Sequence, residues 1–94
     1  MNKQEILKRV VQVIVEVQEV SGRSSAGIDA STCPVFGVEG FDSLSGVEAT
    51  VMLSESLKVE LPGNYNPFIS EDGKRALSVG EIADSLCSYV GSEA

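Results

Sequence analysis

Three stretches of this 94-residue sequence place apolar residues at steps of three and four, the spacing that gives an α-helix one apolar face. They lie within Asn2–Glu19, Gly40–Pro62 and Ser78–Gly91. Because each has an apolar face to bury, we predict a small all-α bundle of three main helices. The apolar residues are Ile6, Val10, Val13, Ile14 and Val17; Leu44, Val47, Val51, Met52, Leu53 and Leu57; and Val79, Ile82, Ala83, Leu86 and Val90.

The first stretch also fits a β-strand. Val11, Val13, Val15 and Val17 alternate at a period of two, and the run VVQVIVEVQEV is rich in β-branched residues. Its length favours a helix, since most strands are shorter. In that helix, Val11 and Val15 point away from the main apolar face.

Residues typical of helix starts precede the predicted helices. Asp42, Ser43 and Ser45 are all natural N-cap residues for the middle helix. The capping-box spacing, in which Glu follows the cap by three residues, occurs at each of the three starts. The pairs are Asn2–Glu5, Ser45–Glu48 and Ser78–Glu81.

The composition disfavours several classes of function. The chain has no His, so it lacks the commonest general base and the commonest ligand of transition metals. Its 14 acidic and 7 basic residues give a net charge of −7, which disfavours nucleic acid and favours a basic-faced protein partner. Cys33 and Cys87 form neither a CxxC motif nor a zinc spacing, and two free thiols are expected, although a disulfide stays open.

No targeting or membrane signal stands out along the chain. None of its stretches reaches the 18 or more apolar residues of a membrane span, and the start MNKQEILKRV does not resemble a signal peptide. We therefore expect one cytoplasmic domain over residues 1–94, monomeric, with no membrane span and no metal site.

The middle segment carries the most specific pattern. Asp42-Ser43-Leu44 follows Gly40, and Val47-Glu48, Met52-Leu53, Glu55 and Leu61-Pro62 come after it without a gap. Together these residues resemble the phosphopantetheine attachment site of acyl carrier proteins. The resemblance covers about a quarter of the chain closely, and the flanking helices agree in kind.

The resemblance implies a carrier rather than an enzyme. A separate phosphopantetheinyl transferase would attach 4′-phosphopantetheine covalently to Ser43, between Asp42 and Leu44. The arm would hold acyl groups as thioesters for acyl-transferring or acyl-elongating enzymes of fatty-acid, lipid or polyketide type. At the first turn of a helix, the backbone N–H groups favour such a phosphodiester anion.

The resemblance also assigns surfaces on the middle helix. Asp42, Leu44, Glu48 and Glu55 would contact basic patches on partner enzymes. Residues of the middle helix that are expected to face the interior would line a pocket for the acyl chain. Two residues of the flap after this helix would complete the pocket. These pocket residues are Val47, Met52, Leu57, Phe68 and Ile69.

The two connecting segments are expected to differ in kind. Ser21–Glu39 is rich in Gly and Ser and should be a long first loop, as in acyl carrier proteins. The resemblance places a short extra helix within Gly63–Leu77. Turn signals at Asn66-Pro67 and Asp72-Gly73 stand on either side of Phe68 and Ile69. The sequence fits two structures equally well here: a flap that also includes Tyr65, or an ordinary surface loop.

The sequence departs from the family pattern in places. Val38-Glu39-Gly40 stands where the family often has Asp-Leu-Gly, Phe41 is bulkier than usual, and Ser45, Ser54 and Ser56 replace common carboxylates. We therefore expect a specialised carrier. Two alternatives stay open, namely a peptidyl or aminoacyl carrier of a peptide-synthetase-like system and an unmodified helical interaction module whose Ser43 is only a cap.

Overall fold

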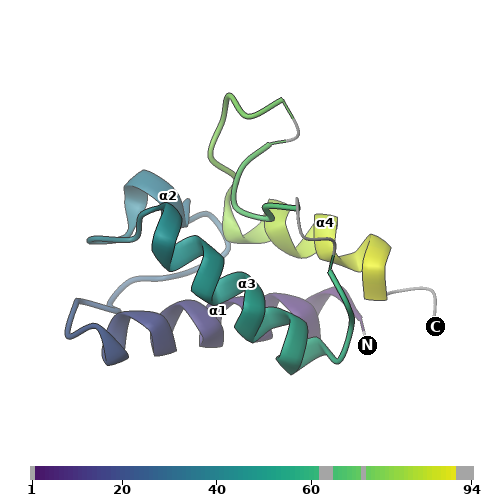
Figure 1. The fold of residues 1–94 in the computed structure, drawn as a ribbon, viewed down its shortest axis with the longest axis horizontal. Coiled ribbons are helices and arrows are strands. Elements are labelled where there is room, and N and C mark those ends of the chain that lie inside the picture. Colours follow the sequence, from purple (N-terminus) through teal and green to yellow (C-terminus); the bar gives the residue numbers. More distant parts are fainter. Residues whose placement is uncertain (1, 62–64, 71, 91–94) are drawn as a thin grey trace.

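The part of the chain that the structure describes forms three long helices and one short one. The computed structural model describes residues 2–61, 65–70 and 72–90. The helices are α1 (Lys3–Val20), α2 (Pro34–Gly37), α3 (Ser43–Leu57) and α4 (Val79–Val90) (Figure 1). Within those ranges there is no strand, only one isolated bridge between Ile69 and Ala76. The prediction of a small all-α fold is confirmed, and the first stretch is a helix.

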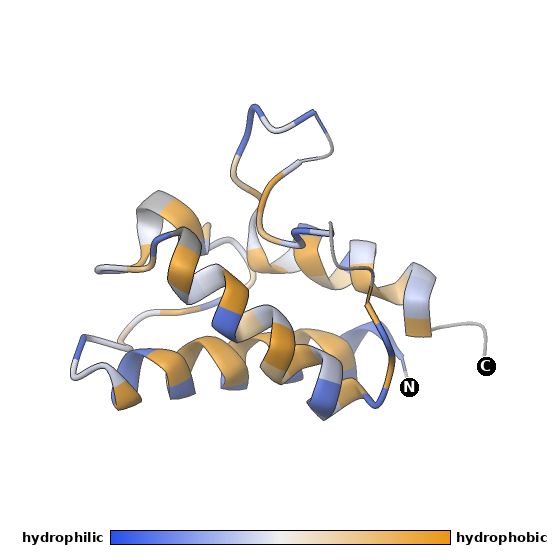
Figure 2. Cartoon of the chain, in the orientation of Figure 1, coloured by the Kyte–Doolittle hydropathy of each residue, from blue (hydrophilic) through white to orange (hydrophobic). Residues whose placement is uncertain are grey.

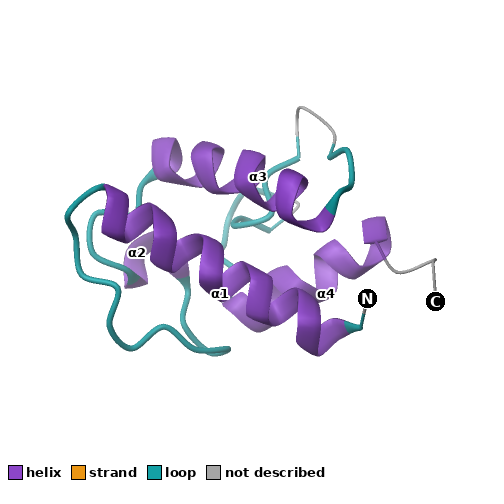
Figure 3. Cartoon of the chain, turned by 90° about the horizontal axis from the view of Figure 1, so that it is seen from below, coloured by secondary structure: helices purple, strands orange, loops and turns teal. Residues whose placement is uncertain are grey.

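Helix α1 is the shared partner of the other two long helices. It packs extensively against both α3 and α4, and Figure 3 shows it running past both. Apolar residues recur along all three helices (Figure 2). Among the described side chains the core is aliphatic apart from two Phe rings, and its members there are Ile6, Val10, Val13, Ile14, Val17, Val38, Phe41, Ala49, Leu53, Leu57, Phe68, Val79, Ile82, Ala83 and Leu86.

The caps of the outer helices agree with the sequence pattern. The side chain of Asn2 accepts a hydrogen bond from the backbone N–H of Glu5 at 2.9 Å. At α4, the Ser78 backbone N–H donates to the Glu81 carboxylate at 2.9 Å, and the Glu81 N–H donates to the Ser78 hydroxyl at 3.2 Å. The capping box at Ser78 is therefore confirmed.

The predicted buried face of α3 is only partly right. Leu53 and Leu57 are buried, as predicted, whereas Leu44, Val47 and Val51 are 72%, 61% and 55% exposed. Aliphatic residues stand on both sides of this helix, so periodicity alone did not determine its orientation. The buried side also carries two small residues, Gly46 and Ala49, and an added Cβ at Gly46 would lie 3.6 Å from the Phe68 ring, an ordinary contact distance.

The segment between α3 and α4 does not contain the predicted extra helix in its described residues, 65–70 and 72–77. Turn-forming side chains explain the difference: the Asn66 side chain accepts from the Phe68 N–H at 3.0 Å, and Gly73 has φ 73°. The short helix of this fold is α2, which begins at Pro34, where proline suits a helix start.

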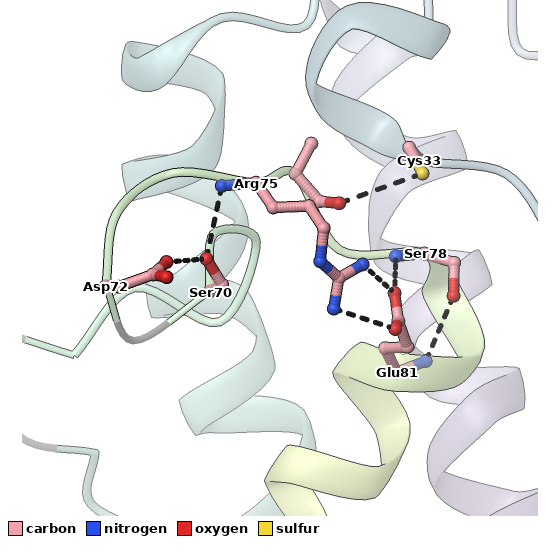
Figure 4. A network of polar contacts seen from close by, with 7 residues as sticks. Cys33, Ser70, Asp72, Arg75, Ser78 and Glu81 are labelled. Carbon is pink, nitrogen blue, oxygen red and sulfur yellow. Dashed lines mark hydrogen bonds and ion pairs between the residues drawn. The ribbon is translucent and has the colours of Figure 1, made fainter.

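A polar network fastens this segment to the start of α4 (Figure 4). The Arg75 guanidinium donates two hydrogen bonds to the Glu81 carboxylate, at 3.0 and 3.2 Å. The Ser70 hydroxyl donates to Asp72 at 2.6 Å and accepts from the Arg75 N–H at 3.1 Å. Because Glu81 also belongs to the capping box with Ser78, one carboxylate joins the loop to the helix.

Glu81→Gln tests this role through pH. The Arg75 hydrogen bonds, followed by that from the Ser78 backbone, lower the pKa of Glu81 from 4.5 to about 2. A carboxyl whose pKa is lowered in the folded state stabilises it above the unfolded pKa, and that contribution is lost as pH falls toward the folded pKa. We expect the variant to have a lower Tm than the wild type at neutral pH, with the difference shrinking as pH falls from 4.5 toward about 2. A pH-independent difference in circular-dichroism melts would contradict this role.

Candidate functional site

The start of α3 is fixed by an N-cap at Asp42. Its carboxylate accepts a hydrogen bond from the backbone N–H of Ser45 at 3.0 Å, and this bond is the main reason that the pKa of Asp42 is lowered. Ser43 is the first residue of the helix. The predicted capping box of Ser45 with Glu48 is therefore wrong, because the helix begins two residues before Ser45, whose side chain is buried inside the first turn.

The predicted partner-binding residues all lie at the surface. Asp42, Leu44, Glu48 and Glu55 are exposed. Sequence reasoning missed that Val47 and Val51 join Leu44 in an exposed apolar row along α3. These three side chains, which we call the α3 apolar row, have the i, i+3, i+7 spacing of one helix face. Large apolar side chains gathered on a surface often mark an interaction site.

The predicted acyl-chain residues do not share one environment. Val47 is exposed, which contradicts its expected interior position, whereas Leu57 and Phe68 are buried in the core. Met52 and Ile69 are half-buried. Met52 lines a groove of about 300 Å³ between α1 and α3, together with Gln12, Val13, Glu16, Glu55 and Ser56.

The flap residues pack inward rather than around a slot. Phe68 stacks at a tilt on Phe41, with ring centroids 5.3 Å apart. Tyr65 instead faces α4, where its ring lies 4.7 Å from that of Tyr89 and its hydroxyl bonds to Ser85. Phe68 thus lies beside Gly46 of α3, whereas Tyr65 packs on α4.

Two residues that sequence reasoning did not identify tie the segment before Ser43 to the rest of the fold. The amide nitrogen of the fully buried Gln18 donates to the carbonyls of Ser24 at 2.8 Å and Glu39 at 2.7 Å. The Arg23 guanidinium donates to the Ser45 hydroxyl at 2.9 Å. We call these contacts the Gln18–Arg23 tether. Its partners lie up to 22 positions apart, so no local pattern in the sequence reveals them.

Arg23 reaches Ser45 by crossing over Gly40. Gly40 has φ 68°, a conformation that strains other residues, and a Cβ there would overlap the end of the Arg23 side chain. The buried Nε of Arg23 and the buried Oε1 of Gln18 have no hydrogen-bond partner among the described residues. Glycine at this position therefore avoids backbone strain and lets Arg23 cross without being displaced.

A groove opens beside this turn. We call it the 35–42 groove, and it has a volume of about 710 Å³. Buried side chains of Val38 and Phe41 form part of its wall, and its lining includes Asp42, the residue before Ser43. Other described lining residues are Val35, Gly37, Glu39 and Gly40.

In the described ranges, no three side chains of His, Cys, Asp or Glu are placed to hold a metal ion. Over the same ranges, no helix has both the length and the apolar character required to cross a membrane. No protein-family model matches this sequence, and comparisons with curated proteins and with solved structures gave no match.

Gly40→Ala tests the crossing of Arg23 over this turn. Gly27 has a similar φ of 75° but open space around it, so Gly27→Ala measures the backbone strain alone, about 1 kcal/mol. We expect Gly40→Ala to lower the free energy of unfolding by more than Gly27→Ala, because Arg23 must also be displaced. In an Arg23→Ala background, Gly40→Ala and Gly27→Ala should lower the free energy of unfolding by the same amount. Urea unfolding of the single and double variants measures this as a double-mutant cycle. An unchanged cost of Gly40→Ala in that background would contradict the crossing.

Proposed function

We propose that this protein is an acyl carrier protein whose Ser43 carries a covalent 4′-phosphopantetheine arm. The observation that supports this most is the position of Ser43 as the first residue of α3, within the sequence Asp42-Ser43-Leu44. In this proposal residues 21–39, which the short helix α2 interrupts, correspond to the long first loop of an acyl-carrier-like bundle. The arm presents thioester-bound acyl groups to fatty-acid, lipid or polyketide-type enzymes.

The local electrostatics favour such a modification. A phosphopantetheinyl transferase would use the Ser43 hydroxyl to displace the nucleotide part of coenzyme A, with the hydroxyl proton passing to the transferase. The product is a phosphodiester anion at the first turn of α3, where unpaired N–H groups and the helix dipole stabilise negative charge. Asp42 already accepts the Ser45 N–H and places a negative charge at the same helix start, so the phosphate would use the remaining N–H groups of the first turn.

The exposed side of α3 suits docking of partner enzymes. The α3 apolar row offers area that a partner would bury, and the exposed carboxylates of Asp42, Glu48 and Glu55 lie on the same helix. A partner with a basic rim around an apolar patch would match both features, because opposite charges speed encounter and apolar contacts stabilise the complex. The net charge of −7 favours the same kind of partner.

The site that would hold the acyl chain is also part of this proposal. Leu57 and Phe68 are buried among core residues, so an acyl chain that entered there would have to open the core. Met52 and Ile69 are half-buried and could move at lower cost. Burying each CH₂ of the chain would stabilise the loaded form by up to about 0.8 kcal/mol.

Intact-mass spectrometry tests the modification. The purified protein is incubated with coenzyme A and a broad-specificity phosphopantetheinyl transferase. We expect a single phosphopantetheine adduct on the wild type, none on Ser43→Ala, and an unchanged adduct on Ser88→Ala, which removes a serine from the exposed side of α4. A folded wild type that stays unmodified would contradict the carrier proposal and favour an unmodified interaction module that docks through the α3 apolar row.

A further inference from the structure

We infer that the 35–42 groove is the seat of the pantetheine arm when Ser43 is loaded. This inference rests on the proposed function and deepens it, because it assigns the arm a binding site on this chain. The resemblance implied a pocket for the acyl chain, with Val47, Leu57 and Phe68 among its residues, and implied no binding site for the arm itself. The structure leaves Val47 exposed and buries Leu57 and Phe68 in the core.

The position of the groove is the first argument. Its lining includes Asp42, and Ser43 is the next residue along the chain. An arm attached to Ser43 therefore starts one residue from the lining of the groove. Residues 38–42 join α2 to the start of α3, so the lining and the attachment residue belong to one stretch of chain (Figure 1).

The chemistry of the lining is the second argument. Pantetheine combines a gem-dimethyl group with a hydroxyl and two amides, so it needs an apolar surface beside accessible hydrogen-bonding groups. The half-buried Val35 supplies apolar surface, and the nearly buried side chains of Val38 and Phe41 add only their edges. Gly37 and Gly40 are exposed and have no side chain, so they leave main-chain peptide groups accessible to the arm.

The third argument is that the groove is formed in advance. Its volume of about 710 Å³ lies within the range of about 300–1,000 Å³ that small-molecule sites occupy. The Gln18–Arg23 tether holds its wall, because Gln18 binds the carbonyl of Glu39 and Arg23 lies over Gly40. A site held in this way needs little ordering when a flexible arm enters it.

The test uses the enzymatically modified protein, with the adduct first verified by mass. In ¹³C,¹⁵N-labelled protein carrying an unlabelled arm, we expect nuclear Overhauser effects between the gem-dimethyl group and the side chains of Val38 and Phe41. Gly37→Leu should abolish them by filling the groove. A Cβ at Gly37 would meet only the Cβ of Cys33, at 3.9 Å, so this variant should fold. Ser88→Leu, a matched bulky substitution on α4, should leave them unchanged.

The outcomes separate the two levels of the proposal. A verified adduct whose arm contacts no groove residue, or contacts Met52 and Ile69 instead, overturns the inference and leaves the carrier function standing. Contacts that persist in Gly37→Leu also overturn it. Failure to form any adduct on folded protein overturns the inference together with the proposed function.

Discussion

The two hydrogen bonds donated by the side-chain amide of Gln18 hold together the part of the fold that leads to Ser43. Gln18 is fully buried near the end of α1, and a buried amide must find partners or destabilise the fold. Its partners are the main-chain carbonyls of Ser24 and Glu39, near the two ends of the segment that joins α1 to α3. This one side chain therefore brings the residues just before Ser43 against α1, the central helix of the core.

The position of Arg23 follows from the same constraint. With Ser24 held against α1, the neighbouring Arg23 extends over Gly40 and binds the Ser45 hydroxyl inside the first turn of α3. The Asp42 cap then completes the helix start. The 35–42 groove lies along this restrained path, so the same contacts that position the candidate attachment residue also shape the space beside it.

Helix α3 has one side that packs in the core and another apolar side that is exposed, to which the proposal assigns partner binding. Ala49, Leu53 and Leu57 bury one side of it, while Leu44, Val47 and Val51 stay in contact with water on another. Exposed aliphatic side chains forgo about 25 cal/mol of stabilisation for each Å² of apolar surface left unburied. A surface of this kind is consistent with a helix that binds partners as well as packing on its own core.

The sequence was informative where the determining contacts are local. The periodicity of α1 and α4 and the capping box at Ser78 predicted those helices, and Asp42 was among the predicted caps of α3. The face of α3 could be predicted only in part, since aliphatic residues stand on both sides of the helix and the choice depends on packing against α1 and other distant residues. Arg23 was missed for the same reason, because its partner Ser45 lies 22 positions away.

The central claim is that Ser43, and no neighbouring serine, bears the arm. Trypsin cleaves after Arg23 and Lys58, so a single peptide of residues 24–58 contains Ser43 together with Ser45 and other serines. After modification by a phosphopantetheinyl transferase, fragmentation of this peptide should place the added mass on ions that include Ser43 and leave ions that begin at Leu44 unmodified. Added mass on Ser45 or on any other serine would contradict the account.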